Sequence, residues 1–232
     1  MNPIARILLL LLFVFSPILA SAELSVFKCI KPISKEVGQK DLLLVQVKYG
    51  EVQSINADFQ QHSYLDALDT WELSSGKLTF SKPGKMKWAY SDPEPQEFIS
   101  DGKTMWFYQP LDKQVMIDTI DMAFKGNLPI SFLLGIGNLS TDFNLKSTCE
   151  SSEGIIFDLV PKKSDQDLGG IRLLVDSKTY LPNGAEVLDA AKNKNSFVFS
   201  NLESNNAVSE DIFSPKFPSG TDKIDNRIRK SS

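Results

Sequence analysis

Hydrophobic and polar residues alternate along most of the chain after residue 54. Ile55, Ala57 and Phe59 alternate with polar neighbours, and Leu78 and Phe80 repeat the same period of two. Alternation of this kind is typical of β-strands with one apolar and one solvated face. Over the whole chain it predicts roughly ten antiparallel strands interrupted by helices. The strands are expected at residues 55–60, 77–81, 85–90, 98–100, 104–108, 114–118, 143–149, 155–160, 171–176, 185–188 and 196–201.

Turn-forming residues separate these segments. Pro83-Gly84 and Ser91-Asp92-Pro93 are typical turn sequences. Asp101-Gly102 lies between two runs rich in β-forming residues and is a strong hairpin signal. Residues 109–113 predict a further turn. The short turns favour a single antiparallel sheet, because only antiparallel neighbours can be joined so closely.

One segment before the strands predicts a short helix. Residues 41–49 carry a nearly continuous run of Leu and Val. Asp41 can cap the start of the helix, and Gly50 can end it. We expect this helix to be buried over most of its circumference, and the polar residues 31–39 before it to be irregular.

A second segment without alternation lies in the middle of the chain. Residues 128–137 are apolar, with Pro129 near the start and Gly135 or Gly137 at the end. Proline early and glycine late are typical of a short helix. The segment therefore predicts a helix or a lid.

The first 22 residues have the features of a secretory signal peptide. Arg6 precedes an unbroken apolar run from Ile7 to Phe15, and Ala20-Ser21-Ala22 supplies a cleavage site. An uncleaved anchor is the alternative, but the run is shorter than the ~20 apolar residues of a membrane-spanning helix. We expect residues 1–22 to be removed and residues 23–232 to form one domain in the periplasm.

The chain has two cysteines, Cys29 and Cys149. In an oxidising compartment an even count favours a disulfide. Closing a loop of this length stabilises the fold by about 4–5 kcal/mol in the chain-entropy model. Lipid attachment at Cys29 is the alternative, but Val26-Phe27-Lys28 lacks the small residues of a lipoprotein processing site.

Charge and missing motifs exclude several classes of function. The formal net charge is −4, and it becomes −5 once Arg6 is removed. An acidic chain without a basic stripe argues against binding to nucleic acid or to anionic lipid headgroups. His62 is the only histidine, so a multi-His metal site is excluded. Phosphate-loop, dinucleotide and nucleophile-elbow motifs are absent from the sequence. We expect no enzyme activity, cofactor or metal.

A large antiparallel sheet has to cover its apolar face or close into a barrel. The two helical segments supply only part of that cover, so a curved sheet would leave a cavity for an apolar ligand. A dry, packed core is the alternative that the pattern alone favours. Lys82 shares the parity of Leu78 and Phe80 and so points to the apolar face. It is either a residue at the rim, with its charge in water, or a contact to the lid.

Two stretches resemble the LolA family of outer-membrane lipoprotein carrier proteins. They are residues 76–96, GKLTFSKPGKMKWAYSDPEPQ, and residues 99–115, ISDGKTMWFYQPLDKQV. The resemblance continues at INADFQQ from Ile55, at LPISFLL from Leu128 and at Phe213-Ser-Pro. It covers nearly all of the chain after the signal peptide, and after Cys149 it is mainly a match of pattern.

The resemblance implies a mainly β fold with some helix: a curved antiparallel sheet that forms an incomplete barrel, covered by short helices. It implies a monomeric periplasmic chaperone whose apolar cavity binds the acyl chains of lipoproteins. Such carriers take cargo from an inner-membrane ABC-type release complex to an outer-membrane receptor, and they are not enzymes. The expected lipid-binding residues are Phe59, Phe80, Met86, Trp88, Tyr90, Trp106, Tyr108, Phe132, Leu133 and Ile136.

Two positions depart from the family pattern. Where the family has an Arg that holds the lid closed, this sequence has Lys82, a single charge in place of a planar fork of donors. Where the family favours Phe, it has Met86, which keeps the site apolar and more adaptable. A weaker latch on the lid is therefore expected. A periplasmic sensor or scaffold that binds lipid on the same fold is the alternative function.

Overall fold

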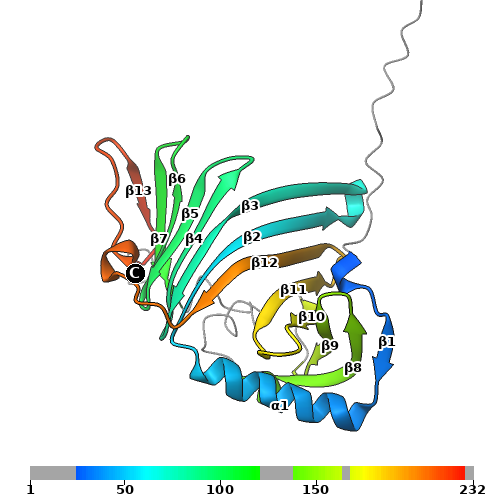
Figure 1. The fold of residues 1–232 in the computed structure, drawn as a ribbon. Coiled ribbons are helices and arrows are strands. Elements are labelled where there is room, and N and C mark those ends of the chain that lie inside the picture. The colour runs from blue at the N-terminus through cyan, green and yellow to red at the C-terminus, as the bar shows by residue number, and fades with distance from the viewer. Residues whose placement is uncertain (1–24, 121–137, 164–167, 228–232) are drawn as a thin grey trace, which may run out of the picture.

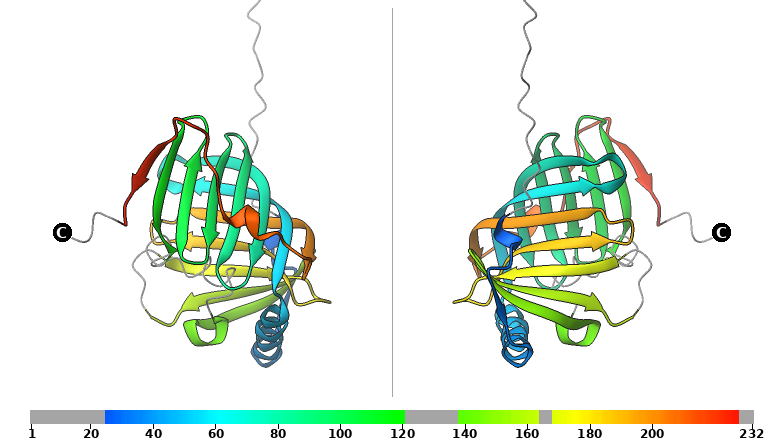
Figure 2. Two further views of the ribbon diagram at one scale, coloured as in Figure 1. Left: turned by 90° about the vertical axis from the view of Figure 1, so that its left-hand side faces the viewer. Right: turned by 90° about the vertical axis from the view of Figure 1, so that its right-hand side faces the viewer.

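The computed structural model describes residues 25–120, 138–163 and 168–227. Their strands form one curved sheet of thirteen strands, in the order β1-β8-β9-β10-β11-β12-β2-β3-β4-β5-β6-β7-β13 (Figures 1 and 2). The strands are β1 (Lys31–Ile33), β2 (Ser54–Leu65), β3 (Thr70–Ser81), β4 (Lys85–Asp92), β5 (Gln96–Asp101), β6 (Thr104–Gln109), β7 (Gln114–Thr119), β8 (Phe143–Ser151), β9 (Gly154–Pro161), β10 (Leu168–Val175), β11 (Pro182–Asp189), β12 (Lys194–Ser204) and β13 (Asp222–Asp225).

The mainly β prediction is confirmed, and each expected strand is present. Two strands were missed: β1, in the segment expected to be irregular, and β13, in a polar C-terminal stretch. β13 pairs with β7 in parallel, so the sheet is mixed at this edge. Both strands are short and charged, so neither gives an alternating pattern. As the two edge strands, β1 and β13 end the sheet on either side and leave the barrel incomplete.

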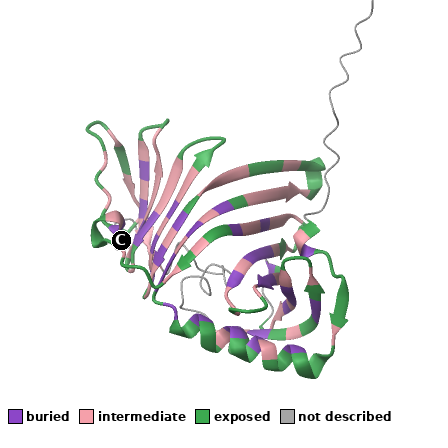
Figure 3. Ribbon diagram, in the orientation of Figure 1, coloured by how far each residue is buried: buried purple, intermediate pink, exposed green. Residues whose placement is uncertain are grey.

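Helix α1 (Lys35–Glu51) begins six residues before the expected start at Asp41. Ser34 caps the helix: its hydroxyl accepts a hydrogen bond from the backbone N–H of Val37. The polar first turn hid this start from the apolar pattern. The expectation of burial on most sides is also wrong, because only one face packs on the sheet. Leu43, Leu44 and Val47 are exposed, and Figure 3 shows much of the side of α1 that faces away from the sheet as exposed.

The main core lies between the concave face of the sheet and α1. Leu42, Val45 and Tyr49 of α1 pack in one cluster with residues from β2–β4 and β8–β12. Gly38 allows the helix to approach closely, since a Cβ there would lie 2.1 Å from the Thr148 hydroxyl oxygen on β8. We call this concave side of the sheet the interior face. No described helix is both long and apolar enough to cross a membrane.

Two short 3-10 helices pack on the outer face of the sheet. Near the N-terminus, η1 (Ser25–Phe27) buries Phe27 in a second cluster with Ile156 and Leu174. The guanidinium of Arg172 donates to the Phe27 carbonyl oxygen and pairs with Asp158 and Glu186. These contacts fix the chain just before Cys29.

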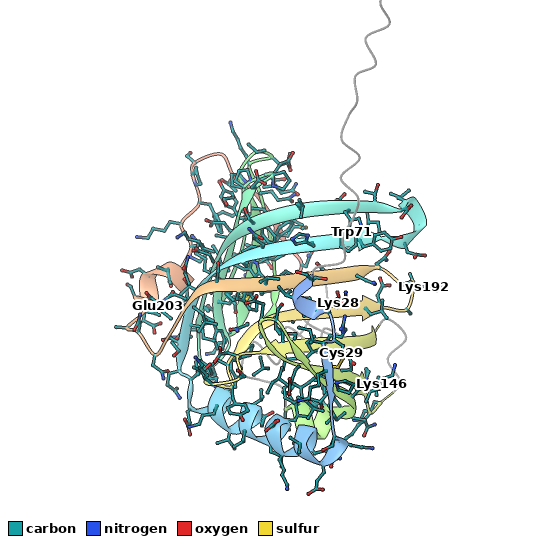
Figure 4. All side chains as sticks on the ribbon, turned by 45° about the vertical axis from the view of Figure 1, so that its right-hand side comes forward. Lys28, Cys29, Trp71, Lys146, Lys192 and Glu203 are labelled. Carbon is teal, nitrogen blue, oxygen red and sulfur yellow. A yellow bond between two sulfur atoms is a disulfide. The ribbon has the colours of Figure 1, made fainter. Side chains whose placement is uncertain are left out.

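Cys29 and Cys149 form a disulfide, with Cα atoms 5.4 Å apart (Figure 4). This is the pairing that the even count favours. Near the other end of the chain, η3 (Glu210–Phe213) buries Phe213 against the outer face of β4 and β5. The outer face of this part of the sheet is therefore covered.

Candidate functional site

Strands β2, β3 and β4 place four of the expected residues together on the interior face. The register pairs Phe80 with Met86, and Leu78 with Trp88. The side chains of these two pairs therefore point to the same side of the sheet. Phe59 of β2 packs edge-on against Trp88, with ring centroids 5.2 Å apart. Phe59, Phe80, Met86 and Trp88 are all buried, as the expected apolar wall requires.

Neighbouring strands extend this aromatic wall with residues that the sequence analysis missed. Phe197 of β12 lies 5.1 Å from Trp88 between ring centroids. On the other side, Phe98 of β5 stacks on Phe107 of β6 at 4.4 Å. Phe98 is paired directly with Trp88 in the sheet. Propagating the parity of Trp88 through the hairpins would have identified Phe98 and Phe107.

Trp106 and Tyr108 lie on the opposite face, so their expected place in the cavity wall is wrong. The register pairs Trp106 with Ile99 and Tyr108 with Glu97, one residue out of step with Phe98. Tyr108 instead packs against Phe217 of the C-terminal segment, with ring centroids 5.0 Å apart. Because that segment also covers the outer face, aromatic residues occur on both sides of β6 and do not identify the interior.

Phe132, Leu133 and Ile136 lie outside the described residues, as does the helix or lid expected at 128–137. The signal peptide expected at 1–22 also lies outside them. These predictions stay predictions.

A polar band follows the apolar wall along the interior face. The Tyr90 hydroxyl donates to the side-chain oxygen of Gln61 at 2.6 Å. The Gln61 amide then donates to Asn195 at 2.7 Å and to Ser63 at 3.1 Å. Burial raises the pKa of Tyr90 to about 12, so its hydroxyl stays protonated at neutral pH. We call Gln61, Ser63, Tyr90 and Asn195 the polar band.

Trp88 carries a buried polar atom without a partner. The residue is 5% exposed, and its Nε1 has no acceptor among the described residues. A buried donor left unpaired costs about 1–3 kcal/mol. This donor lies on the interior face, two residues along β4 from Tyr90 of the polar band.

A small cavity of about 20 Å³ lies where α1 ends against the sheet. Such a volume holds roughly one water molecule, so a long acyl chain does not fit without movement. Its walls are apolar and come from α1 and four strands: Tyr49, Ile55, Ala57, Leu78, Phe80, Pro182, Phe199 and Leu202.

Lys82 joins the turn after β3 to the C-terminal end of α1. Its ammonium group donates to the carbonyl oxygens of Tyr49 at 2.5 Å and Gly50 at 3.4 Å. It also lies 4.8 Å from the centre of the Tyr49 ring. The last carbonyls of a helix lack partners within the helix and attract a cation. Burial lowers the pKa of Lys82.

The interior face presents no arrangement suited to acid-base or nucleophilic chemistry among the described residues. His62 points to the outer face, since it is paired with Ser196, whose hydroxyl binds Glu186 on that side. Burial lowers the pKa of His62. Apolar walls with a few oriented polar groups are instead typical of a site that binds an apolar ligand.

Comparison with known proteins gives a consistent result. Residues 50–216 match the family model described as outer membrane lipoprotein carrier protein LolA. The chain is 30% identical over 193 residues to the outer-membrane lipoprotein carrier protein of Nitrosomonas europaea, covering 79% of this chain and 93% of that protein. It is 32% identical over 174 residues to the same-named protein of Bordetella avium, covering 75% and 82%.

Among solved structures, an uncharacterized conserved protein from Thermus thermophilus superposes with a TM-score of 0.53. The match covers 82% of this chain and 99% of that one, at 13% identity. At this identity the likeness shows a shared fold and no more.

Proposed function

The chain belongs to the LolA family of outer-membrane lipoprotein carrier proteins, and we propose that it carries lipoproteins with their acyl chains against the interior face. Carriers of this family are periplasmic and non-enzymatic, and the Cys29–Cys149 disulfide fits an oxidising compartment. The observation that carries the proposal is the continuous aromatic wall of Phe59, Trp88 and their neighbours on the concave side of the sheet.

Burial on this wall supplies the binding energy. Each methylene group moved from water to an apolar environment contributes about 0.8 kcal/mol, so two or three acyl chains would bind tightly. A carrier also has to release its cargo. Because Tyr49 of α1 shares a buried cluster with Phe80 and Met86, cargo that enters there competes with the contacts between α1 and the sheet, which lowers the net affinity.

Lys82 holds the C-terminal end of α1 beside the turn after β3. We propose that its hydrogen bonds to α1 favour the closed state and that cargo displaces this end of the helix. The family's inner-membrane release complex and outer-membrane receptor are the proposed partners for loading and handover. The latch therefore acts on α1, whereas the sequence analysis expected it to act on residues 128–137.

Binding of a dipalmitoyl-glyceryl-cysteine peptide by the purified protein tests the proposal. Met86→Glu would place a charge among the acyl chains and should abolish binding. Phe98→Glu tests the same wall at a half-buried position, where the fold tolerates the change more readily. Thr79→Glu, on the outer face of β3, is the control and should bind normally.

The thermal unfolding of each variant separates loss of fold from loss of binding. Folded Met86→Glu and Phe98→Glu proteins that bind the lipopeptide as the parent does would contradict the assignment of the interior face. A parent protein that binds no lipopeptide would contradict the proposed function itself.

A further inference from the structure

We propose that the indole N–H of Trp88 donates a hydrogen bond to a carbonyl oxygen at the head of a bound acyl chain. That oxygen belongs to the ester that joins the chain to the glycerol of the lipoprotein. The inference rests on the proposed carrier function and adds a specific contact and an orientation for the cargo.

The first support is the unpaired donor itself. Trp88 is 5% exposed, and its Nε1 has no acceptor among the described residues. Among the described residues its closest aromatic neighbours are Phe59 and Phe197, whose rings are weak acceptors at best. Buried donors in native proteins nearly always have a partner, so one left open in a binding interior points to a ligand that supplies it.

The second support is the position of Trp88 between two zones of the interior. Along β4 the interior side chains run from Met86 through Trp88 to Tyr90, and along β2 Phe59 precedes Gln61. On β2 and β4 the apolar side chains therefore give way to the polar band just beyond Trp88.

An acylated lipid has the same order of groups: methylene chains, then a carbonyl, then glycerol and the peptide. Placing the carbonyl at Trp88 puts the chains toward Phe80 and Met86. It puts the glycerol and the first peptide groups against Tyr90 and Gln61, whose side chains donate and accept hydrogen bonds. The opposite orientation would bury the polar head in the apolar wall and leave methylene groups on the polar band.

The test compares two lipopeptides that differ only at the carbonyl. One is a dipalmitoyl-glyceryl-cysteine peptide, and the other is its dihexadecyl ether analogue, which has chains of equal length and no ester carbonyl. Because one neutral hydrogen bond shifts an affinity by up to about tenfold, we expect the parent protein to prefer the ester by roughly three- to tenfold. Both affinities are measured by displacement of a fluorescent fatty acid.

Trp88→Phe removes the N–H and keeps a buried aromatic ring. We expect it to bind both lipopeptides with equal affinity, since only the carbonyl contact distinguishes them. Trp106→Phe makes the same substitution on the outer face and should keep the ester preference. A spectroscopic measurement does not depend on affinity: the infrared band of a ¹³C-labelled ester carbonyl should lie at lower frequency in the complex with the parent protein than in the complex with Trp88→Phe.

The outcomes separate the two proposals. If the parent binds both lipopeptides equally and the carbonyl band is the same in its complex as in that of Trp88→Phe, the Trp88 contact is wrong and the carrier function stands. An ester preference that survives in Trp88→Phe also overturns the contact. If the parent binds neither lipopeptide, the carrier function fails, and the inference fails with it.

Discussion

The ammonium nitrogen of Lys82 lies 2.5 Å from the carbonyl oxygen of Tyr49 and 4.8 Å from the centre of the Tyr49 ring. One side chain thus binds both the backbone and the ring of a single helical residue. Tyr49 is itself buried in the core between α1 and the sheet. The contact therefore couples the turn after β3 to the position of the helix that covers the interior.

Replacing Lys82 should change loading and release in opposite directions. Lys82→Leu removes the cation from the helix end, so α1 should open more readily, cargo should load more easily, and release should slow. Lys82→Arg offers a planar fork of donors to the same carbonyls and should favour closure, with weaker loading and faster release. The measurement is a two-step assay that follows loading from inner membranes and then release to outer membranes.

The unfolding free energy gives an independent reading of the same contact. Hydrogen bonds from a charged group contribute about 1.5–3 kcal/mol, so Lys82→Leu should lower the unfolding free energy by roughly that amount. If loading and release fall together in both variants, Lys82 only stabilises the fold and does not govern opening.

The strands were predictable where one face of the sheet is solvated. At Ile55, Ala57 and Phe59 the polar neighbours face outward, so alternation gives both the strand and its interior face. In β5–β7 the C-terminal segment covers the outer face, and Ile99 and Val115 are buried there. Hydrophobicity then occurs on both sides, which is why Trp106 and Tyr108 were assigned to the wrong face.

Other features depend on contacts between residues far apart in the sequence. Whether Leu43 and Val47 are buried is decided by how α1 docks on β8, and no local pattern records that docking. The partner of Lys82 could not be predicted either. The period of two correctly indicated that Lys82 points to the apolar face. The carbonyls that it binds lie at the end of α1, and no local pattern shows that this helix end lies beside the turn after β3.

The disulfide predicts a response to reductant. Thiol labelling of the denatured, unreduced protein should detect no free cysteine, because Cys29 and Cys149 are bonded. Reduction should lower the unfolding free energy by about 4–5 kcal/mol, since the unfolded chain regains the freedom that the bond removed. A Cys29→Ala/Cys149→Ala variant should be insensitive to reductant. Two labelled thiols per unreduced chain would contradict the pairing.

Tyr90 predicts a loss of stability at high pH. Its pKa is raised by burial to about 12 from an ordinary 10.0. A tyrosine whose pKa is higher in the folded than in the unfolded protein makes its full contribution to the unfolding free energy below pH 10. That contribution is lost as the pH rises from 10 toward 12. The unfolding free energy of the parent should therefore fall relative to Tyr90→Phe between about pH 10 and 12. A difference that stays constant over this range would show that Tyr90 is not buried as described.

Tryptophan fluorescence should show which face of the sheet meets the cargo. Trp88 lies on the interior face, Trp106 on the outer face, and Trp71 at the far end of the β2–β3 hairpin (Figure 4). A Trp71→Phe/Trp106→Phe variant, with Trp88 alone, should be strongly quenched by a lipopeptide with brominated acyl chains, because bromine quenches only on close contact. A Trp71→Phe/Trp88→Phe variant reports Trp106 and should keep its emission. Equal quenching of both variants would mean that the acyl chains do not distinguish the faces, and the interior assignment would fail.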